Sequence, residues 1–348
     1  MRYNGSIKGV LNNSSPTSSP GMWSVNDVQE NRTDVNWPSD NPAGADSFDY
    51  LLVGGGGGGG GGVSSDAVGG GGGGGQVVSG TGIIDTSSPY SITIGNGGSH
   101  GSGFDAGSNG SPTNFSNPSG FSVEALGGGA GSGYNDFAGP HTAANAGGGG
   151  GGNGAGNGSP GTVYNGGDGA KDGNNRGGGG GGAGAGGAGS NGTAGGNGGA
   201  GGPGLLSNIT GTNVYYGEGG GGGSNAGSGG APVNGVGGGG GSASSGNVGD
   251  NGNRSTVRST GAGGGGAAVY GSGPTYASGG GGENGCLILR YPNMYDLYMD
   301  NWESGSGPNA PINVIVKDHY NGTDKVAIFM GRNQSNIYWV KSSSAKEF

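Results

Sequence analysis

The stretch GGGGGGGGG at Gly54–Gly62, followed by GGGGGGG at Gly69–Gly75, decides what this chain can fold into. Glycine makes up 103 of the 348 residues, and further unbroken runs lie at 147–152, 177–182, 219–223 and 237–241. Glycine has no side chain to bury and loses more conformational freedom on folding than any other residue. Such runs are flexible linkers unless hydrogen bonds between backbones order them. Short apolar segments at both ends of the glycine region, 48–53 and 286–291, favour an ordered domain.

The ordered form open to such runs is the polyglycine II helix, with three residues per turn, about 3.1 Å rise and no internal hydrogen bonds. Its amides point outward in three directions, so rods lying side by side can bond to one another. Residues 177–204 keep a period of three. Every third residue from Gly177 to Gly204 is glycine except Ala183, and the frame from 185 to 203 reads Ala, Ala, Asn, Ala, Asn, Ala, Pro. This phase predicts a rod packed inside along one edge and exposed along another. Collagen is excluded, because its strict repeat and abundant proline are missing.

Charge and reactive residues exclude several functions. The net charge of −9 argues against a basic nucleic-acid interface. The single cysteine, Cys286, lies in an apolar stretch and is expected in the core, so no disulfide framework exists. The three histidines, His100, His141 and His319, are far apart, and none pairs with the cysteine as metal ligands would. No phosphate-binding loop or carboxylate pair stands out. We therefore predict a protein that is not an enzyme and that needs no cofactor or metal.

Composition divides the chain into three parts. Residues 1–47 form a polar arm with a short helix predicted at 25–32, and Trp23 and Trp37 are expected to anchor this arm to a larger body. Residues 48–291 form the glycine-rich domain. There we expect strands at 48–53, 76–79, 90–94, 121–126, 214–216 and 286–291, with the first pairing with the last.

Residues 292–348 contain fewer glycines and more β-branched and aromatic residues. Strand patterns lie at 312–317, 325–330 and 337–341, with a hairpin signal at Asn321-Gly322. Tyr295, Met299 and Trp302 have helical spacing and predict a short helix. This part is either a small β-meander packed on the domain or on a neighbouring subunit, or an oligomerisation or recognition module. The predicted fold is mostly β and irregular: a small β-sheet base, a bundle of polyglycine II helices and a small C-terminal β-meander.

Four motifs carry a resemblance to a known family. They are Tyr-Leu-Leu-Val-Gly-Gly-Gly at 50–56, Tyr-Ser-Ile-Thr-Ile-Gly-Asn-Gly-Gly at 90–98, Ser-Asn-Ile-Thr-Gly-Thr-Asn-Val-Tyr-Tyr-Gly at 207–217, and Gly-Cys-Leu-Ile-Leu-Arg-Tyr at 285–291. In order and spacing these resemble the glycine-rich domain of bacteriophage tail-fibre and other virion proteins, and the polyglycine II architecture is similar to that of some phage tail-fibre adhesins. Residues 20–38 also look like the segment that often precedes this domain in phage proteins. The resemblance implies a protein on the surface of a phage particle, and the lack of a signal-peptide core at the N-terminus fits release by lysis.

The resemblance implies a tail fibre or receptor-binding adhesin that presents loops from a rigid lattice to the host surface. The alternative is a decoration or structural protein of capsid or tail, and a polysaccharide depolymerase is a third class. Implied partners are other virion proteins, a host-surface glycan or outer-membrane protein, and further copies of the chain, for example in a homo-oligomeric trimer; nucleic acid is not among them. Loop aromatics are the candidate receptor-binding residues, unless they only cover the lattice edge. These candidates are Tyr134, Asp136, Phe137 and His141 in one loop, with Phe104, Phe115, Tyr164, Tyr270 and Tyr276 elsewhere, whereas Trp23 and Trp37 are candidates for virion docking.

Overall fold

The fold is described here from a computed structural model of the chain. The described residues are 46–63, 67–133, 145, 147–148, 151–152, 156–242, 259–269, 276–299, 313–318, 324–330 and 334–341. The chain divides into two units, Met1–Ser47 and Phe48–Phe348. Only residues 46 and 47 of the first unit are described, so the predicted helix at 25–32, Trp23 and Trp37 lie outside the described residues. The remaining account concerns the second unit.

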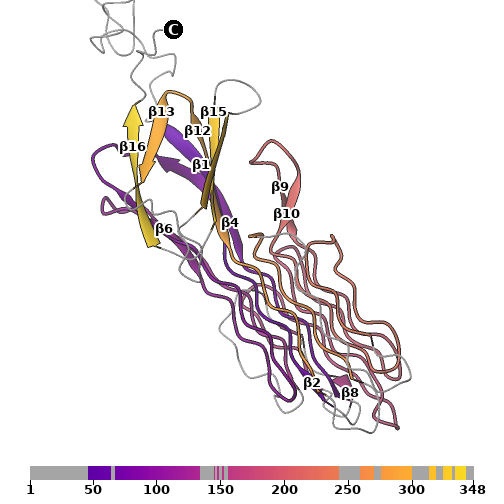
Figure 1. The fold of residues 1–348 in the computed structure, drawn as a ribbon. Helices are drawn as coiled ribbons and strands as arrows, with labels where there is room; N and C mark the ends of the chain where they lie inside the picture. Colours follow the sequence, from indigo (N-terminus) through magenta and orange to yellow (C-terminus); the bar gives the residue numbers. More distant parts are fainter. Residues whose placement is uncertain are drawn as a thin grey trace, which may run out of the picture. The chain divides into compact units, whose positions relative to one another are not determined.

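Two five-stranded sheets form the base of this unit (Figure 1). The first sheet has the order β14 (Asn313–Asp318), β15 (Asp324–Met330), β12 (Cys286–Pro292), β1 (Ser47–Val53) and β4 (Val77–Ile83). The second has the order β13 (Tyr295–Met299), β16 (Gln334–Lys341), β5 (Tyr90–Thr93), β6 (Thr113–Ser116) and β7 (Ser122–Ala125). Short strands make a four-stranded patch of β2 (Gly62–Val63), β3 (Ala67–Val68), β8 (Gly151–Gly152) and β11 (Tyr276–Ala277), and a hairpin of β9 (Leu205–Ser207) and β10 (Val214–Tyr216). No helix occurs in the described ranges, and the fold is mostly β and irregular, as predicted.

The predicted closure of the domain by its first and last apolar strands is confirmed. Strands β1 and β12 pair antiparallel, from Asp49 opposite Arg290 to Val53 opposite Cys286. Alternate residues of β1 point to opposite sides of the sheet, as in any strand. Phe48, Tyr50 and Leu52 enter the core between the two sheets, whereas Leu51 and Val53 enter a smaller core beneath the β9–β10 hairpin. Strand β1 is therefore buried on both faces, which explains its nearly continuous apolar sequence.

Aromatic rings fill much of the core between the sheets. Phe48 of the first sheet stacks on Trp339 of the second, with ring centroids 5.4 Å apart and planes 22° apart. It also meets Tyr90 and Phe115 edge to face, at 5.8 and 5.7 Å. Such pairs add about 0.5–1.5 kcal/mol each beyond the area they bury. This core fastens the two sheets together at the end from which the glycine rods start.

The rod Gly54–Gly61, here called the central rod, shows how backbone hydrogen bonds order polyglycine. Its amides donate with a repeat of three residues to three neighbours, at 70–76, 105–111 and 280–283, over N···O distances of 2.8–3.0 Å. The residue numbers fall along these neighbours as they rise along the central rod, so the neighbours run antiparallel to it. Its carbonyls accept with the same repeat from segments 98–101, 128–131 and 264–267, which run parallel to it. The central rod is thus bonded along its length to six neighbouring segments, three antiparallel and three parallel to it.

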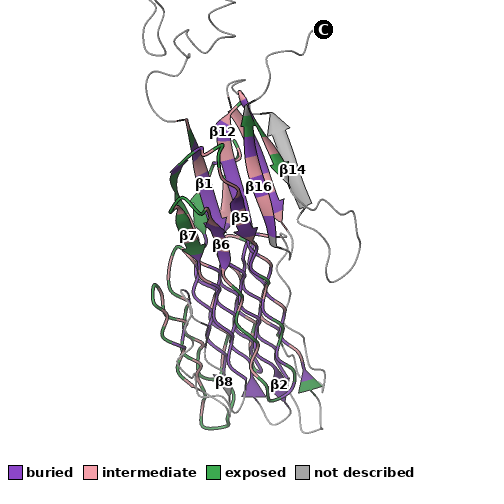
Figure 2. Ribbon diagram, turned by 90° about the vertical axis from the view of Figure 1, so that its left-hand side faces the viewer, coloured by how far each residue is buried: buried purple, intermediate pink, exposed green. Residues whose placement is uncertain are grey.

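Glycine is required in this lattice because the backbones touch. A Cβ atom on any residue from Gly54 to Gly60 would lie 1.9–2.1 Å from a carbonyl oxygen of a neighbouring rod. All residues of the central rod are buried, as are those of 69–75 (Figure 2). The runs are thus the interior of the domain, although they contribute no side chain to it.

The period of three in 177–204 has the predicted effect on exposure only in part, and the segment is not one rod. No residue of the frame from 185 to 203 is buried, as predicted. The glycine frame is buried at 177–183 and 201–204, but its members from 186 to 198 are not. The chain reverses at 184–187, where Gly184 and Gly187 bond to each other through their backbones, and again at 193–196. The phase therefore continues through three short rods joined by tight turns.

The C-terminal part does not form the separate meander that was predicted. Strands β14 and β15 extend the first sheet beside β12, whereas β13 and β16 extend the second beside β5. The described strands that follow residue 292 are thus divided between the two sheets. The predicted helix starting at Tyr295 is wrong, because Tyr295–Met299 is strand β13; Trp302 lies outside the described residues.

Candidate functional site

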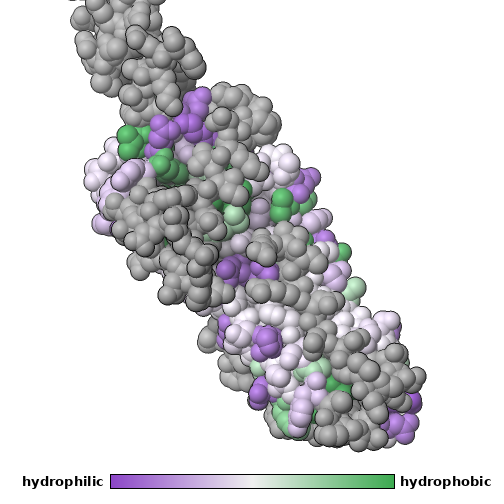
Figure 3. All heavy atoms as spheres, viewed as in Figure 1, coloured by the Kyte–Doolittle hydropathy of each residue, from purple (hydrophilic) through white to green (hydrophobic). Residues whose placement is uncertain are grey.

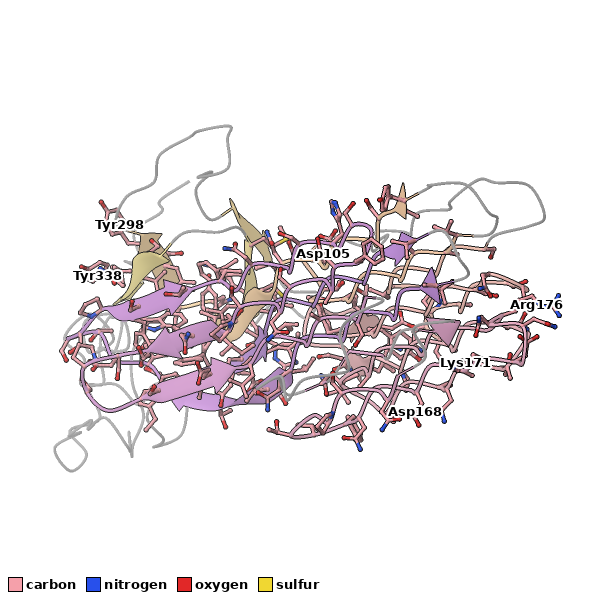
Figure 4. The ribbon with its side chains drawn as sticks, turned by 90° about the horizontal axis from the view of Figure 1, so that it is seen from below. Asp105, Asp168, Lys171, Arg176, Tyr298 and Tyr338 are labelled. Carbon is pink, nitrogen blue, oxygen red and sulfur yellow. The ribbon has the colours of Figure 1, made fainter. Side chains whose placement is uncertain are left out.

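Turns join the rods at the end of the lattice away from the two sheets. In Figure 4, Lys171 and Arg176 lie at that end, whereas Tyr298 and Tyr338 lie at the opposite end, on strands β13 and β16. The rods are held by their backbones, so a side chain on such a turn has a rigid support. On the face seen in Figure 3, the described surface along the rods has the nearly neutral hydropathy of glycine, with small hydrophobic and hydrophilic groups between. Recognition by this surface would therefore depend on the few larger side chains at the turns.

Phe104 and Tyr276 form a ring pair at one of these turns. Their ring centroids are 6.2 Å apart and their planes cross at 68°, although 172 residues separate them in the chain (276 minus 104). Gly103, with a φ of +60°, makes the turn before Phe104, and its amide donates to the carbonyl of Ala277 at 3.2 Å. Phe104 is 43% exposed and Tyr276 63%. The sequence predicted both rings as binding residues, and the fold brings them together.

A charged turn at 172–176 is the second feature of the rod ends. The Oδ1 atom of Asp172 accepts the backbone amides of Asn174 and Arg176, both at 2.8 Å, and its Oδ2 atom accepts Nε of Arg176 at 3.3 Å. These bonds, led by that from the Arg176 amide, lower the pKa of Asp172. They also tie down a turn in which Asn175 has a φ of +62°. No motif in the sequence predicted a site at these residues, although Asp, Asn and Gly at 172–175 are typical turn formers.

The other predicted binding residues have different outcomes. Phe115 is a correction: it lies on β6 in the core, 0% exposed and stacked 5.1 Å from the ring of Tyr90, so it cannot meet a receptor. Tyr164 is partly exposed and forms a backbone bridge with Asn145. The remaining candidates, Tyr134, Asp136, Phe137, His141 and Tyr270, lie outside the described residues.

The burial of the cysteine and the grouping of the potential metal ligands bear on whether the described part of the chain holds a reactive site. Cys286 is buried as predicted, and burial raises the pKa of its thiol to about 12. No group of three or more metal-ligating side chains occurs among the residues that the structure describes. In the same residues, no helix has the length and apolar character needed to span a membrane.

A groove at the sheet end was not predicted. It has a volume of about 370 Å³ and lies between the outer face of the first sheet and the β9–β10 hairpin. Its lining comes from β1, β4, β12 and the hairpin: Asp49, Tyr50, Leu51, Ser79, Gly80, Thr81, Ser207, Asn208, Ile209 and Arg290. The Asp49–Arg290 ion pair lies on its wall, with Nε of Arg290 3.1 Å from Oδ2 of Asp49. Four separate segments contribute, so only the folded topology could reveal it.

Comparison with known proteins identifies the family. A family model described as a glycine-rich domain matches residues 33–292. The match covers about three quarters of the chain, and the chain belongs to this glycine-rich domain family. A search among curated proteins gave no match. The family match ends at residue 292, and the strands that complete both sheets, β13 to β16, follow it.

Proposed function

We propose that this protein is a structural protein of a phage particle, of the tail-fibre or receptor-binding adhesin type, which attaches to the host surface through the turns of its glycine lattice. The observation that carries the proposal is the combination of a backbone-bonded lattice with the exposed Phe104–Tyr276 pair at a rod end. The resemblance of its motifs to phage glycine-rich domains supports the assignment to a phage particle. In this role the protein acts by binding and has no catalytic activity.

A rigid lattice suits attachment because binding costs less free energy when the contact residues are already in place. The turn at Phe104 is fastened on both sides: the Gly101 amide donates to Gly59 at 2.9 Å, and the Gly61 amide donates to Asp105 at 2.9 Å. Aromatic rings give large contact area with few rotatable bonds. The Phe104–Tyr276 pair thus offers a rigid apolar contact for a glycan ring or an outer-membrane loop.

Adsorption of virions to host cells tests this function. Virions with Phe104→Ala and Tyr276→Ala together should assemble normally but adsorb several-fold more slowly, because the ring pair is lost while the rods remain. Tyr298→Ala is the matched control, since Tyr298 is also 63% exposed but lies on β13 at the sheet end.

The predicted loop aromatics need a second variant, Tyr134→Ala with Phe137→Ala. Unchanged adsorption in both double variants would refute attachment through these aromatic residues. Copy number separates the alternative role: a few copies at the tail fit an adhesin, whereas tens to hundreds over the shell would make the protein a decoration component.

A further inference from the structure

The groove beneath the β9–β10 hairpin has a mainly polar accessible lining. Its floor is formed by Leu51 and Ile209, which are packed in the core and only 2% and 8% exposed. The hairpin is held over the sheet by apolar packing, since Tyr216 and Ile209 join Leu51 and Ile288 in one core cluster. The hydroxyls of Ser79 and Thr81 and the amide of Asn208 lie around this floor. The hairpin therefore forms one wall of a preformed site.

The ion pair in the groove leaves hydrogen-bonding capacity unused. Both Nε and Nη2 of Arg290 donate to the same oxygen, Oδ2 of Asp49. Among the described residues, Oδ1 of Asp49 and Nη1 of Arg290 have no other partner. The side chains of Asp49 and Arg290 are 36% and 34% exposed, so a ligand in the groove can reach these atoms. Asp49 then offers an acceptor next to the guanidinium donors of Arg290.

We infer that this groove binds one or two sugar units of a neutral glycan. A sugar hydroxyl both donates and accepts, and a carboxylate oxygen next to a guanidinium and a side-chain amide satisfies both functions. The charges of Asp49 and Arg290 cancel, which favours a neutral ligand over a phosphate or a sialic acid. The volume of about 370 Å³ is within the range of about 300–1,000 Å³ typical of ligand pockets.

This inference deepens the proposed function by adding a glycan site at the sheet end, and it rests on that function only for the source of the glycan. The site does not involve the rod-end turns. Loss of one can therefore be measured without loss of the other.

Purified full-length protein on an array of neutral hexose and N-acetylhexosamine oligosaccharides, with sialylated and sulfated members included, tests the groove. Asn208→Ala should weaken binding of the best neutral glycan tenfold or more, because it removes a donor and an acceptor from an exposed side chain. Thr81→Ala should weaken it by a smaller factor. Thr212→Ala is the matched control on the same hairpin loop, outside the groove, and should change binding less than twofold.

Equal melting temperatures for the three variants would show that the fold is retained. Neutral-glycan binding that is lost in Asn208→Ala and kept in Thr212→Ala supports the groove. Binding that is unaffected by Asn208→Ala, that is confined to charged glycans, or that is absent from the whole array overturns it. The array result is independent of the adsorption phenotype of Phe104→Ala with Tyr276→Ala, so failure of the groove and failure of the attachment role are distinguishable.

Discussion

Replacing a single glycine of the central rod by alanine should destabilise the domain strongly. At Gly57, the added Cβ would lie 2.0 Å from the carbonyl oxygen of Gly129 and 2.6 Å from its carbon. Both are backbone atoms, so no side chain can rotate out of the way. Ordinary contact begins near 3.4 Å, and the segment containing Gly129 would have to retreat by about 1.4 Å (3.4 minus 2.0).

Such a retreat breaks hydrogen bonds that hold this segment to the central rod. The amides of Gly128 and Gly131 donate to Gly55 and Gly58 at 2.8 Å, and 1.4 Å more puts both beyond bonding range. Leaving buried polar groups unsatisfied costs about 1–3 kcal/mol per bond. Alanine restricts the unfolded chain and returns about 0.4–1 kcal/mol. Two lost bonds cost about 2–6 kcal/mol, so the net loss expected for Gly57→Ala is about 1–6 kcal/mol.

Guanidinium unfolding followed by far-ultraviolet circular dichroism measures this loss. The matched control is Gly281→Ala, also in a rod, where a Cβ would meet nothing closer than the Gly98 oxygen at 3.7 Å. We expect the control to change the free energy of unfolding by less than about 1 kcal/mol. Equal midpoints for Gly57→Ala and Gly281→Ala would refute the backbone contact on which the lattice argument rests.

Four further predictions concern single polar groups. Glu218 is fully buried and accepts three backbone amides, so Glu218→Ala should cost about 2–4 kcal/mol in guanidinium unfolding and increase hydrogen exchange at those amides. Thr113→Val removes a buried hydroxyl that donates to one backbone carbonyl at 2.6 Å and accepts one amide at 2.9 Å, and should cost about 2–4 kcal/mol in the same assay. The pKa of Cys286 is about 12 in the folded protein against an ordinary value of 9.0, so the free energy of unfolding should fall as the pH rises from 9 to 12. This fall should be smaller in Cys286→Ala. A thiol reagent at pH 8 should label only unfolded protein. The pKa of Asp85 is about 2, chiefly because the Ser87 hydroxyl donates to it, and a nuclear magnetic resonance titration should find it closer to 3.8 in Ser87→Ala.

The features predicted correctly from the sequence depend on local patterns. Strands β1 and β12 are apolar except for Ser47, Asp49 and Arg290, and burial of their remaining residues on both faces requires that. The period of three in 177–204 follows from contact between backbones, which leaves no room for a side chain on the inner edge. In both cases the physical requirement acts on every residue of a short segment, so the segment itself carries the signal.

The features that were missed depend on partners distant in the chain. The spacing of four residues between Tyr295 and Met299 predicts a helix. In the structure Tyr295 is buried and Tyr298 is exposed, as expected for a strand that pairs with β16. Phe115 stands among polar residues, and it is buried because it packs against Phe48 in the core between the two sheets. The contact between Phe104 and Tyr276 likewise could not be predicted without knowing which rods are neighbours.

The lattice raises the question of what sets its register, because an all-glycine rod cannot. Advancing a threefold helix by one residue places each glycine where its neighbour was, so the same backbone bonds form again. Side chains that replace a backbone carbonyl do not have this symmetry. The Oδ1 atoms of Asn109, Asn225 and Asn284 each accept a backbone amide from another segment, at 2.8, 2.8 and 3.0 Å. A slip by one residue would break each of these bonds while it preserves the glycine bonds. The position of the rod-end turns, and with it the geometry of any attachment surface there, is therefore set by a few amide side chains, and the glycines supply only the stiffness.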